Sequence, residues 1–122
     1  MSIALAGSLH AAATPRPLDQ LVVFEDLHCV YCTLWEHDVG RIYEKTDEAK
    51  VLALRRVDYR APRPDDLAAV APITTWPTFV VIHCGREFRR ITGYNSQYQF
   101  WGLLDNAIRA LRTAPTCQGK PS

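Results

Sequence analysis

The sequence predicts an α/β domain with a mixed four-stranded sheet flanked by helices, in the order β-α-β-α-β-β-α. Short apolar, β-branched runs predict strands, and segments with apolar side chains at helical spacing predict helices. Strands and helices alternate at first, which favours a parallel pair joined by a right-handed crossover. The last two strands adjoin, so we expect a closing hairpin to add an antiparallel edge.

The first predicted strand is the continuous apolar run Gln20–Glu25. An amphipathic helix of about four turns follows, because Trp35, Val39, Ile42 and Thr46 recur at helical spacing with charged residues between them. Gly40 lies inside this helix and is expected to weaken it by roughly 1 kcal/mol.

Turn residues divide the rest of the chain into further elements. They are a strand over 51–57, a short helix over 65–70 opened by Pro64, a strand over 78–82 and, after a Gly85-Arg86 turn, a strand over 87–91. Beyond Gly93, Ser96 and Gln99 predict a capping box for the final helix. Its expected buried side chains are Tyr98, Trp101, Leu104, Ile108 and Leu111, and Pro115 ends it.

Length and composition favour one globular domain. The 122 residues predict a domain over 18–114, preceded by a tail or signal remnant with a linker over 1–17 and followed by a polar tail over 115–122. A net charge of +1 gives no basis for binding nucleic acid or an anionic membrane. No apolar run approaches the roughly 20 residues that cross a bilayer, so we expect a soluble protein.

Cys29 and Cys32 form a C-x-x-C pair at the predicted strand-to-helix junction. Unpaired backbone amides at a helix N-terminus stabilise a thiolate, so Cys29 is the expected nucleophile. Cys32 is one helical turn further and lies on the same face, where it can resolve a mixed disulfide. A pair of core cysteines or half a zinc site is the other interpretation, and the position after a buried strand favours redox chemistry.

Residues around the pair are candidates for tuning and for substrate binding. His28, if protonated, would stabilise the Cys29 thiolate, and Glu25 and Asp26 would oppose it. Val30 and Tyr31, between the cysteines, are candidates for substrate binding, and neither of them is a proline. Pro77, after Trp76, opens a predicted strand, where it either avoids a ladder hydrogen bond or forms a cis peptide beside the dithiol.

These motifs resemble the thioredoxin superfamily. The matching segments are 24–32, 76–79 and Gly93, and the resemblance covers roughly residues 18 to 112. It implies a thioredoxin fold and a thiol:disulfide oxidoreductase that needs no cofactor. Cys29 would attack, Cys32 would resolve, and Pro77 would be the cis-proline beside a substrate strand held by the backbone of Trp76.

Within the superfamily the sequence most resembles the periplasmic thioredoxins of bacterial sulfur-oxidation (Sox) systems. The Val30-Tyr31 dipeptide looks like that of disulfide isomerases, and the small size looks like glutaredoxin. The Sox resemblance implies a periplasmic reductase that a membrane thiol-disulfide transporter keeps reduced. Its partners would be protein disulfides or mixed disulfides on Sox proteins, such as the sulfur-carrier complex.

Three departures separate the sequence from ordinary thioredoxins. His28 replaces the tryptophan before the first cysteine, Trp76 is bulkier than the usual residue before the cis-proline, and Val23 replaces the buried carboxylate. Deprotonation of Cys32 therefore needs another base, either Glu25 or water.

The other two cysteines leave alternatives open. Cys84 is either a buried small hydrophobe or the partner of Cys117 in a disulfide that pins the C-terminal tail. As an alternative function, Cys29 and Cys32 with His83 or Cys84 would form a metal-binding module, although their spacing matches no standard zinc finger.

Overall fold

A computed structural model describes residues 17–117 of the chain. The predicted signal remnant and the end of the polar tail, residues 118–122, lie outside the described residues. Within them the predicted fold class is confirmed: a mixed four-stranded sheet is flanked by helices.

The sheet has the strand order β2-β1-β3-β4. β1 (Gln20–Glu25) pairs in parallel with β2 (Ala53–Asp58) and antiparallel with β3 (Thr78–His83), which pairs antiparallel with β4 (Arg86–Thr92). The two central strands, β1 and β3, are buried along nearly their whole length. The predicted crossover and closing hairpin are therefore both present.

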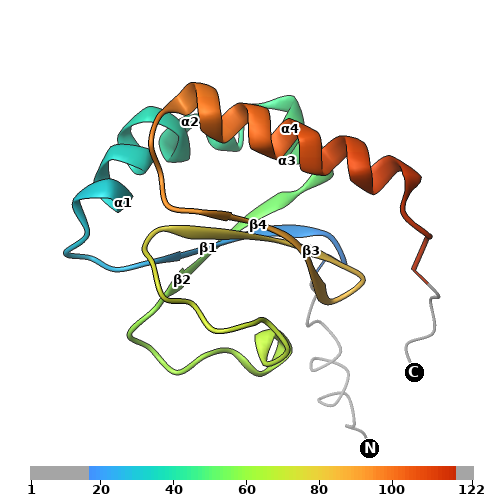
Figure 1. The fold of residues 1–122 in the computed structure, drawn as a ribbon, viewed down its shortest axis with the longest axis horizontal. Helices are drawn as coiled ribbons and strands as arrows, with labels where there is room; N and C mark the ends of the chain where they lie inside the picture. Colours follow the sequence, from blue (N-terminus) through green and yellow to red (C-terminus); the bar gives the residue numbers. More distant parts are fainter. Residues whose placement is uncertain (1–16, 118–122) are drawn as a thin grey trace, which may run out of the picture.

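The helices cover one face of this sheet, and a long connection covers the other (Figure 1). The helical elements are α1 (Val30–Trp35), the π-helical turn η2 (Glu36–Gly40), α2 (Arg41–Tyr43), α3 (Asp47–Val51), the 3₁₀ turn η3 (Asp65–Leu67) and α4 (Gln97–Thr113). The segment 59–77, which contains η3, lies on the face opposite α1 and α4. The predicted helix over 65–70 is thus only a single 3₁₀ turn.

Alternation along β1 separates two apolar clusters. Leu21 and Val23 pack under the helices, whereas Val22 and Phe24 face the connection that carries η3. Glu25 follows Val23 by two residues, so the same alternation directs its side chain to the helix-covered face, at the end of the strand where α1 begins.

The predicted buried stripe of the first long helix was partly wrong. Trp35 and Val39 are buried as expected, but the next buried side chain is Tyr43, and Ile42 is 37% exposed. The cause is η2, because a π-helical turn holds more residues than an α-helical turn and shifts the buried face by about one position. Thr46 does not continue this helix; its hydroxyl accepts a hydrogen bond from the Ala49 amide and caps α3.

The final helix also differs in detail. Leu104 and Ile108 are buried as predicted, but Tyr98 is 89% exposed and Phe100 takes the buried position in the first turn. Ser96 caps α4 by accepting a hydrogen bond from the Gln99 amide at 3.2 Å. The Gln99 side chain instead accepts from Asn95, so only half of the predicted capping box is present.

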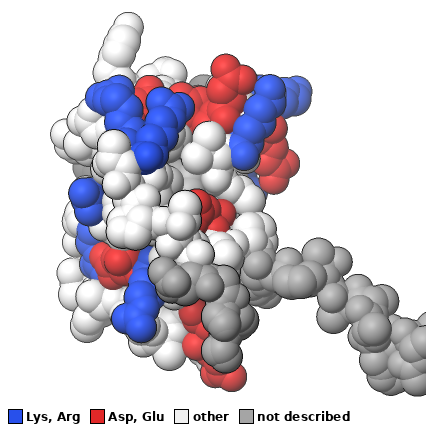
Figure 2. Space-filling model, turned by 90° about the vertical axis from the view of Figure 1, so that its right-hand side faces the viewer, with Lys and Arg blue, Asp and Glu red and all other residues white. Residues whose placement is uncertain are grey.

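Surface charge is mixed in sign. Figure 2 shows basic and acidic side chains interspersed on the face that it presents, in keeping with the net charge of +1. Among the described residues no helix is long and apolar enough to span a membrane.

Candidate active site

Cys29 lies at the junction between β1 and α1, in the N-cap position of the helix. A tight turn delivers it there: the Asp26 carboxylate accepts the His28 amide at 3.0 Å, and the Cys29 amide donates to the Asp26 carbonyl at 3.0 Å. The Cys29 Sγ in turn accepts the Cys32 amide at 3.0 Å. A backbone donor on this sulfur stabilises negative charge there.

Cys32 lies one turn further along α1 and is buried, whereas Cys29 is half-buried. Burial, followed by the hydrogen bond with Cys29, raises the pKa of the Cys32 thiol to about 12. Cys32 is therefore protonated at neutral pH, and it needs a base before it can act as a nucleophile.

The Trp76–Pro77 peptide bond is cis and lies beside the first cysteine. The Cys29 thiol donates to the Trp76 carbonyl across 3.4 Å. Gly93, whose φ of +79° suits glycine, donates its amide to the Pro77 carbonyl at 2.8 Å and ties this loop to the end of β4. The structure thus brings together the three motifs that the sequence had placed far apart.

Glu25 lies close to the second cysteine. Both residues line a pocket of about 260 Å³ between the end of β1 and the start of α1. Desolvation raises the pKa of the Glu25 carboxyl, and Arg56, whose Nε is 4.0 Å from it, opposes that effect. A carboxyl group with a raised pKa beside a buried thiol is a suitable proton acceptor.

The other predicted tuning residue has a different place. His28 is exposed, and it donates a hydrogen bond to Asp26 through its backbone amide. That amide, followed by the Arg60 guanidinium at 3.1 Å, lowers the pKa of the Asp26 carboxyl. The sequence predicted Asp26 only as a charge that opposes His28, and Arg60 was missed; the Asx turn at Asp26 was the available signal.

Exposed apolar side chains surround Cys29. Leu27 is 86% exposed, Val30 68% and Tyr31 58%. On the other side, the Trp76 ring lies against Tyr59, with 4.2 Å between ring centroids. Because apolar surface of this kind marks contact sites, this rim is suited to binding an extended polypeptide.

The alternative metal module is contradicted by the structure. Cys29 lies beside the start of β3, whereas His83 and Cys84 lie at its far end, roughly 20 Å away at the usual rise per strand residue. Cys84 is moreover bonded to Cys117 in a disulfide, the pairing that the sequence left open.

Comparison with known proteins assigns the chain to a family. Residues 9–108 match the family model described as a thioredoxin-like domain, and the chain belongs to this family. A search of curated protein sequences gave no significant match.

The similar solved structures include the periplasmic thioredoxin SoxS from Paracoccus pantotrophus. It is 32% identical, with a TM-score of 0.72 over 76% of this chain and 98% of that one. Thioredoxin from Fasciola hepatica is 22% identical, with a TM-score of 0.55 over 73% and 80% of the two chains. A thioredoxin-fold protein from Helicobacter pylori is 19% identical, with a TM-score of 0.61 over 80% and 73%.

Proposed function

We propose that this chain is a thiol:disulfide oxidoreductase that reduces protein disulfides through Cys29 and Cys32. One observation carries the proposal. Cys29 is a half-buried N-cap thiol between an amide donor and the Trp76 carbonyl, and Cys32 is buried directly behind it. An accessible attacking sulfur with a protected resolving sulfur is what two-step exchange needs.

In the first step the Cys29 thiolate attacks one sulfur of a substrate disulfide. The new bond joins Cys29 to that sulfur, the old disulfide bond breaks, and its other sulfur leaves as a thiolate. The Cys32 amide, 3.0 Å from the Cys29 Sγ, stabilises the attacking thiolate before the reaction.

In the second step Cys32 loses its proton and attacks the Cys29 sulfur. The second substrate sulfur leaves, and Cys29 and Cys32 form a disulfide, so two electrons have passed to the substrate. Glu25 accepts the Cys32 proton, because the two share a pocket large enough for a bridging water. An external dithiol then restores the starting state, a role that suits a membrane thiol-disulfide transporter.

The substrate segment lies over the apolar rim formed by Leu27, Val30 and Tyr31. Backbone groups of Trp76, next to Pro77, hold it in an extended conformation, as in strand addition to a sheet edge. The Trp76 carbonyl that now accepts the Cys29 thiol becomes available once that sulfur has reacted. Selectivity thus comes from apolar contact rather than charge.

The proposed location is the bacterial periplasm, and the proposed partners are disulfides or mixed disulfides on sulfur-oxidation proteins. Two observations support this. SoxS, at 32% identity, is described as a periplasmic thioredoxin, and a disulfide outside the C-x-x-C pair, Cys84–Cys117, is typical of proteins in an oxidising compartment.

Two single substitutions test the mechanism on a protein disulfide substrate. Cys29→Ser should abolish reduction, because the attacking sulfur is lost. Cys32→Ser should accumulate a mixed disulfide at Cys29, visible as a mass increase that a reductant reverses. The double variant Cys84→Ser/Cys117→Ser is the control and should keep its activity.

The trapping variant also tests the partner. Cys32→Ser, expressed in the periplasm of a sulfur-oxidising bacterium, should capture proteins of sulfur oxidation through Cys29. Capture of only unrelated secreted proteins would contradict the proposed partners while leaving the exchange chemistry intact. Full activity of Cys29→Ser would contradict the chemistry itself.

A further inference from the structure

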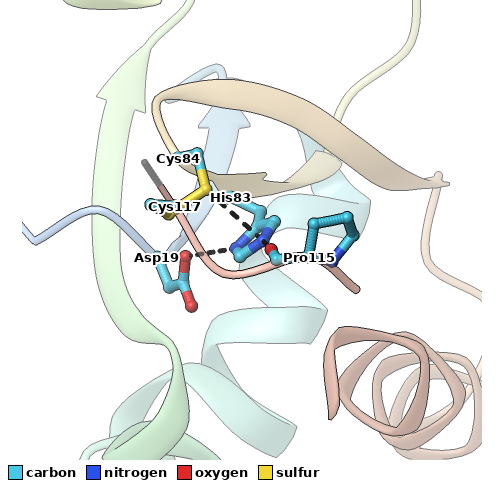
Figure 3. Close-up of a disulfide and its surroundings, with 5 residues drawn as sticks. All are labelled: Asp19, His83, Cys84, Pro115 and Cys117. Carbon is cyan, nitrogen blue, oxygen red and sulfur yellow. Dashed lines mark hydrogen bonds and ion pairs between the residues drawn. A yellow bond between two sulfur atoms is a disulfide. The ribbon is translucent and has the colours of Figure 1, made fainter. Parts of the chain in front are cut away.

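A second cluster of chemically reactive side chains lies at the far end of β3 from Cys29. His83, Cys84 and Cys117 offer one ligand atom each, and these atoms lie within 4.8 Å of one another. Figure 3 shows the His83 ring between the disulfide, the Asp19 carboxylate and the Pro115 carbonyl. The Nε2 atom of His83 is 3.4 Å from the Cys84 Sγ.

The hydrogen bond at Nδ1 of His83 matches that of a metal-binding imidazole. This nitrogen lies 2.8 Å from the Asp19 Oδ1 and donates to that carboxylate, whereas Nε2 donates to the Pro115 carbonyl at 3.0 Å and lies 3.4 Å from the Cys84 Sγ. Metal-bound histidines usually donate their other ring N–H to a carboxylate or carbonyl, which fixes the ring and strengthens the ligand. Asp19 provides that support from the start of β1.

The spacing also suits a tetrahedral metal. Two thiolates on Zn²⁺ lie about 3.8 Å apart, given Zn–S distances of about 2.3 Å. The two sulfurs are now bonded to each other and need only separate to that distance, while Nε2 is already adjacent. Two thiolates and one imidazole are a donor set that zinc prefers over harder cations.

We propose that reduction of the Cys84–Cys117 disulfide creates a zinc site in which His83, Cys84 and Cys117 supply three ligands. A dithiol reductant is oxidised to its disulfide, and two electrons convert the Cys84–Cys117 bond to two thiols. Zinc then binds as each thiol releases its proton. Nε2 also binds in its unprotonated form, so its hydrogen bond to the Pro115 carbonyl is lost.

The site is open on one side. His83 and Cys117 line a groove of about 550 Å³ whose walls include Leu18 and Leu111. Both cysteines are half-buried, so a reductant can reach the bond. The groove leaves the fourth zinc position to water. In the oxidised protein the disulfide holds the C-terminal segment against the sheet, and in the reduced protein the metal takes over this role.

The test uses the full chain carrying Cys29→Ser and Cys32→Ser, so that every remaining thiol belongs to the proposed site. After reduction with a phosphine and its removal without oxygen, the protein is titrated with Co²⁺ as a spectroscopic probe. We expect one Co²⁺ per chain, with thiolate charge-transfer and tetrahedral d–d bands that Zn²⁺ abolishes. The zinc dissociation constant should be about 1 µM or tighter.

Substitutions separate this site from weak surface binding. His83→Gln should weaken zinc binding at least tenfold, and Asp19→Asn about tenfold through the ring it supports. His37→Gln is the matched control, because His37 also pairs with a carboxylate, Asp38 at 3.1 Å, but forms no hydrogen bond to sulfur within residues 17–117. It should leave the titration unchanged.

Several results would overturn the proposal. The first is that the reduced chain lacks the charge-transfer band although circular dichroism shows it to be folded, and the second is that the reduced chain unfolds. The others are that two chains share one metal, or that Cys84→Ser still binds the metal. The oxidised protein should show none of these cobalt bands, and their appearance there would also count against the site.

Discussion

At the residue scale, the proposed role of Glu25 as a base opposes its effect on stability. Desolvation raises the pKa of its carboxyl, so between the unfolded and folded pKa values the native state binds more protons than the unfolded chain. The contribution of Glu25 to the free energy of unfolding is therefore fully present below the pKa of the unfolded chain. It is lost as the pH rises through the pKa of the folded protein. At neutral pH the ionised carboxylate therefore costs stability.

Glu25→Gln should slow the resolving step by about tenfold or more, because Cys32 loses its proton acceptor. The fall in rate as pH drops through the raised pKa should vanish in this variant. At neutral pH the variant should unfold at a higher urea concentration than the parent protein. Rapid-quench assays of the mixed disulfide and urea titration measure the two effects.

Glu36→Gln is the control for this prediction. Glu36 lines the same pocket and pairs with Arg56 at 2.9 Å, but its side chain is 44% exposed. Its charge helps to raise the pKa of Glu25, so Glu36→Gln should move the pH dependence toward lower pH but keep it, and should leave the resolving rate at neutral pH unchanged. If the two variants behave alike, or if Glu25→Gln resolves as fast as the parent protein, Glu25 is not the base.

At the scale of elements, Gly40 ends the π-helical turn η2, and close packing explains why a residue that disfavours helix occurs there. A Cβ on Gly40 would lie 2.7 Å from Cζ3 of the fully buried Trp35 ring and 2.5 Å from Oε1 of Glu36. Gly40→Ala should therefore destabilise the protein by about 1–3 kcal/mol, as overpacking does. Thermal unfolding would measure it.

Gly102 offers the matched comparison. It lies in α4, is exposed, and a Cβ there would meet nothing within 4 Å. Gly102→Ala should stabilise the protein by about 0.5–1 kcal/mol, the usual gain for a helical glycine. Equal effects of the two substitutions would show that packing against Trp35 does not decide the role of Gly40.

The same elements show what the sequence could and could not predict. β1 and β3 were found because a buried strand is a continuous apolar run, and the dithiol because C-x-x-C follows such a run. Ile42 was predicted to be buried in place of Tyr43, because the spacing of apolar residues does not reveal a π-helical turn. Tyr98 was misplaced because spacing alone does not choose between it and Phe100.

At the scale of the whole molecule, two sulfur pairs lie at opposite ends of β3, one a free dithiol and the other a disulfide. The sequence identified the first pair by its local setting. It could not decide the second pairing, because Cys84 and Cys117 are 33 residues apart and their proximity depends on how β4 and α4 return the chain to the sheet. His83, Asp19 and Pro115 meet there for the same reason.

The Cys84–Cys117 disulfide closes a loop that contains β4 and α4, so its reduction should lower global stability. For a separation of 33 residues, loop entropy predicts a loss of about 3–4 kcal/mol in the free energy of unfolding. Urea titration of the Cys29→Ser/Cys32→Ser protein, with and without reductant, measures this directly, because only one disulfide is present. An unchanged urea midpoint would contradict this prediction, because the bond closes the same loop in the unfolded chain. Addition of Zn²⁺ to the reduced sample should recover part of the loss, since a ligand that binds only the folded chain stabilises it.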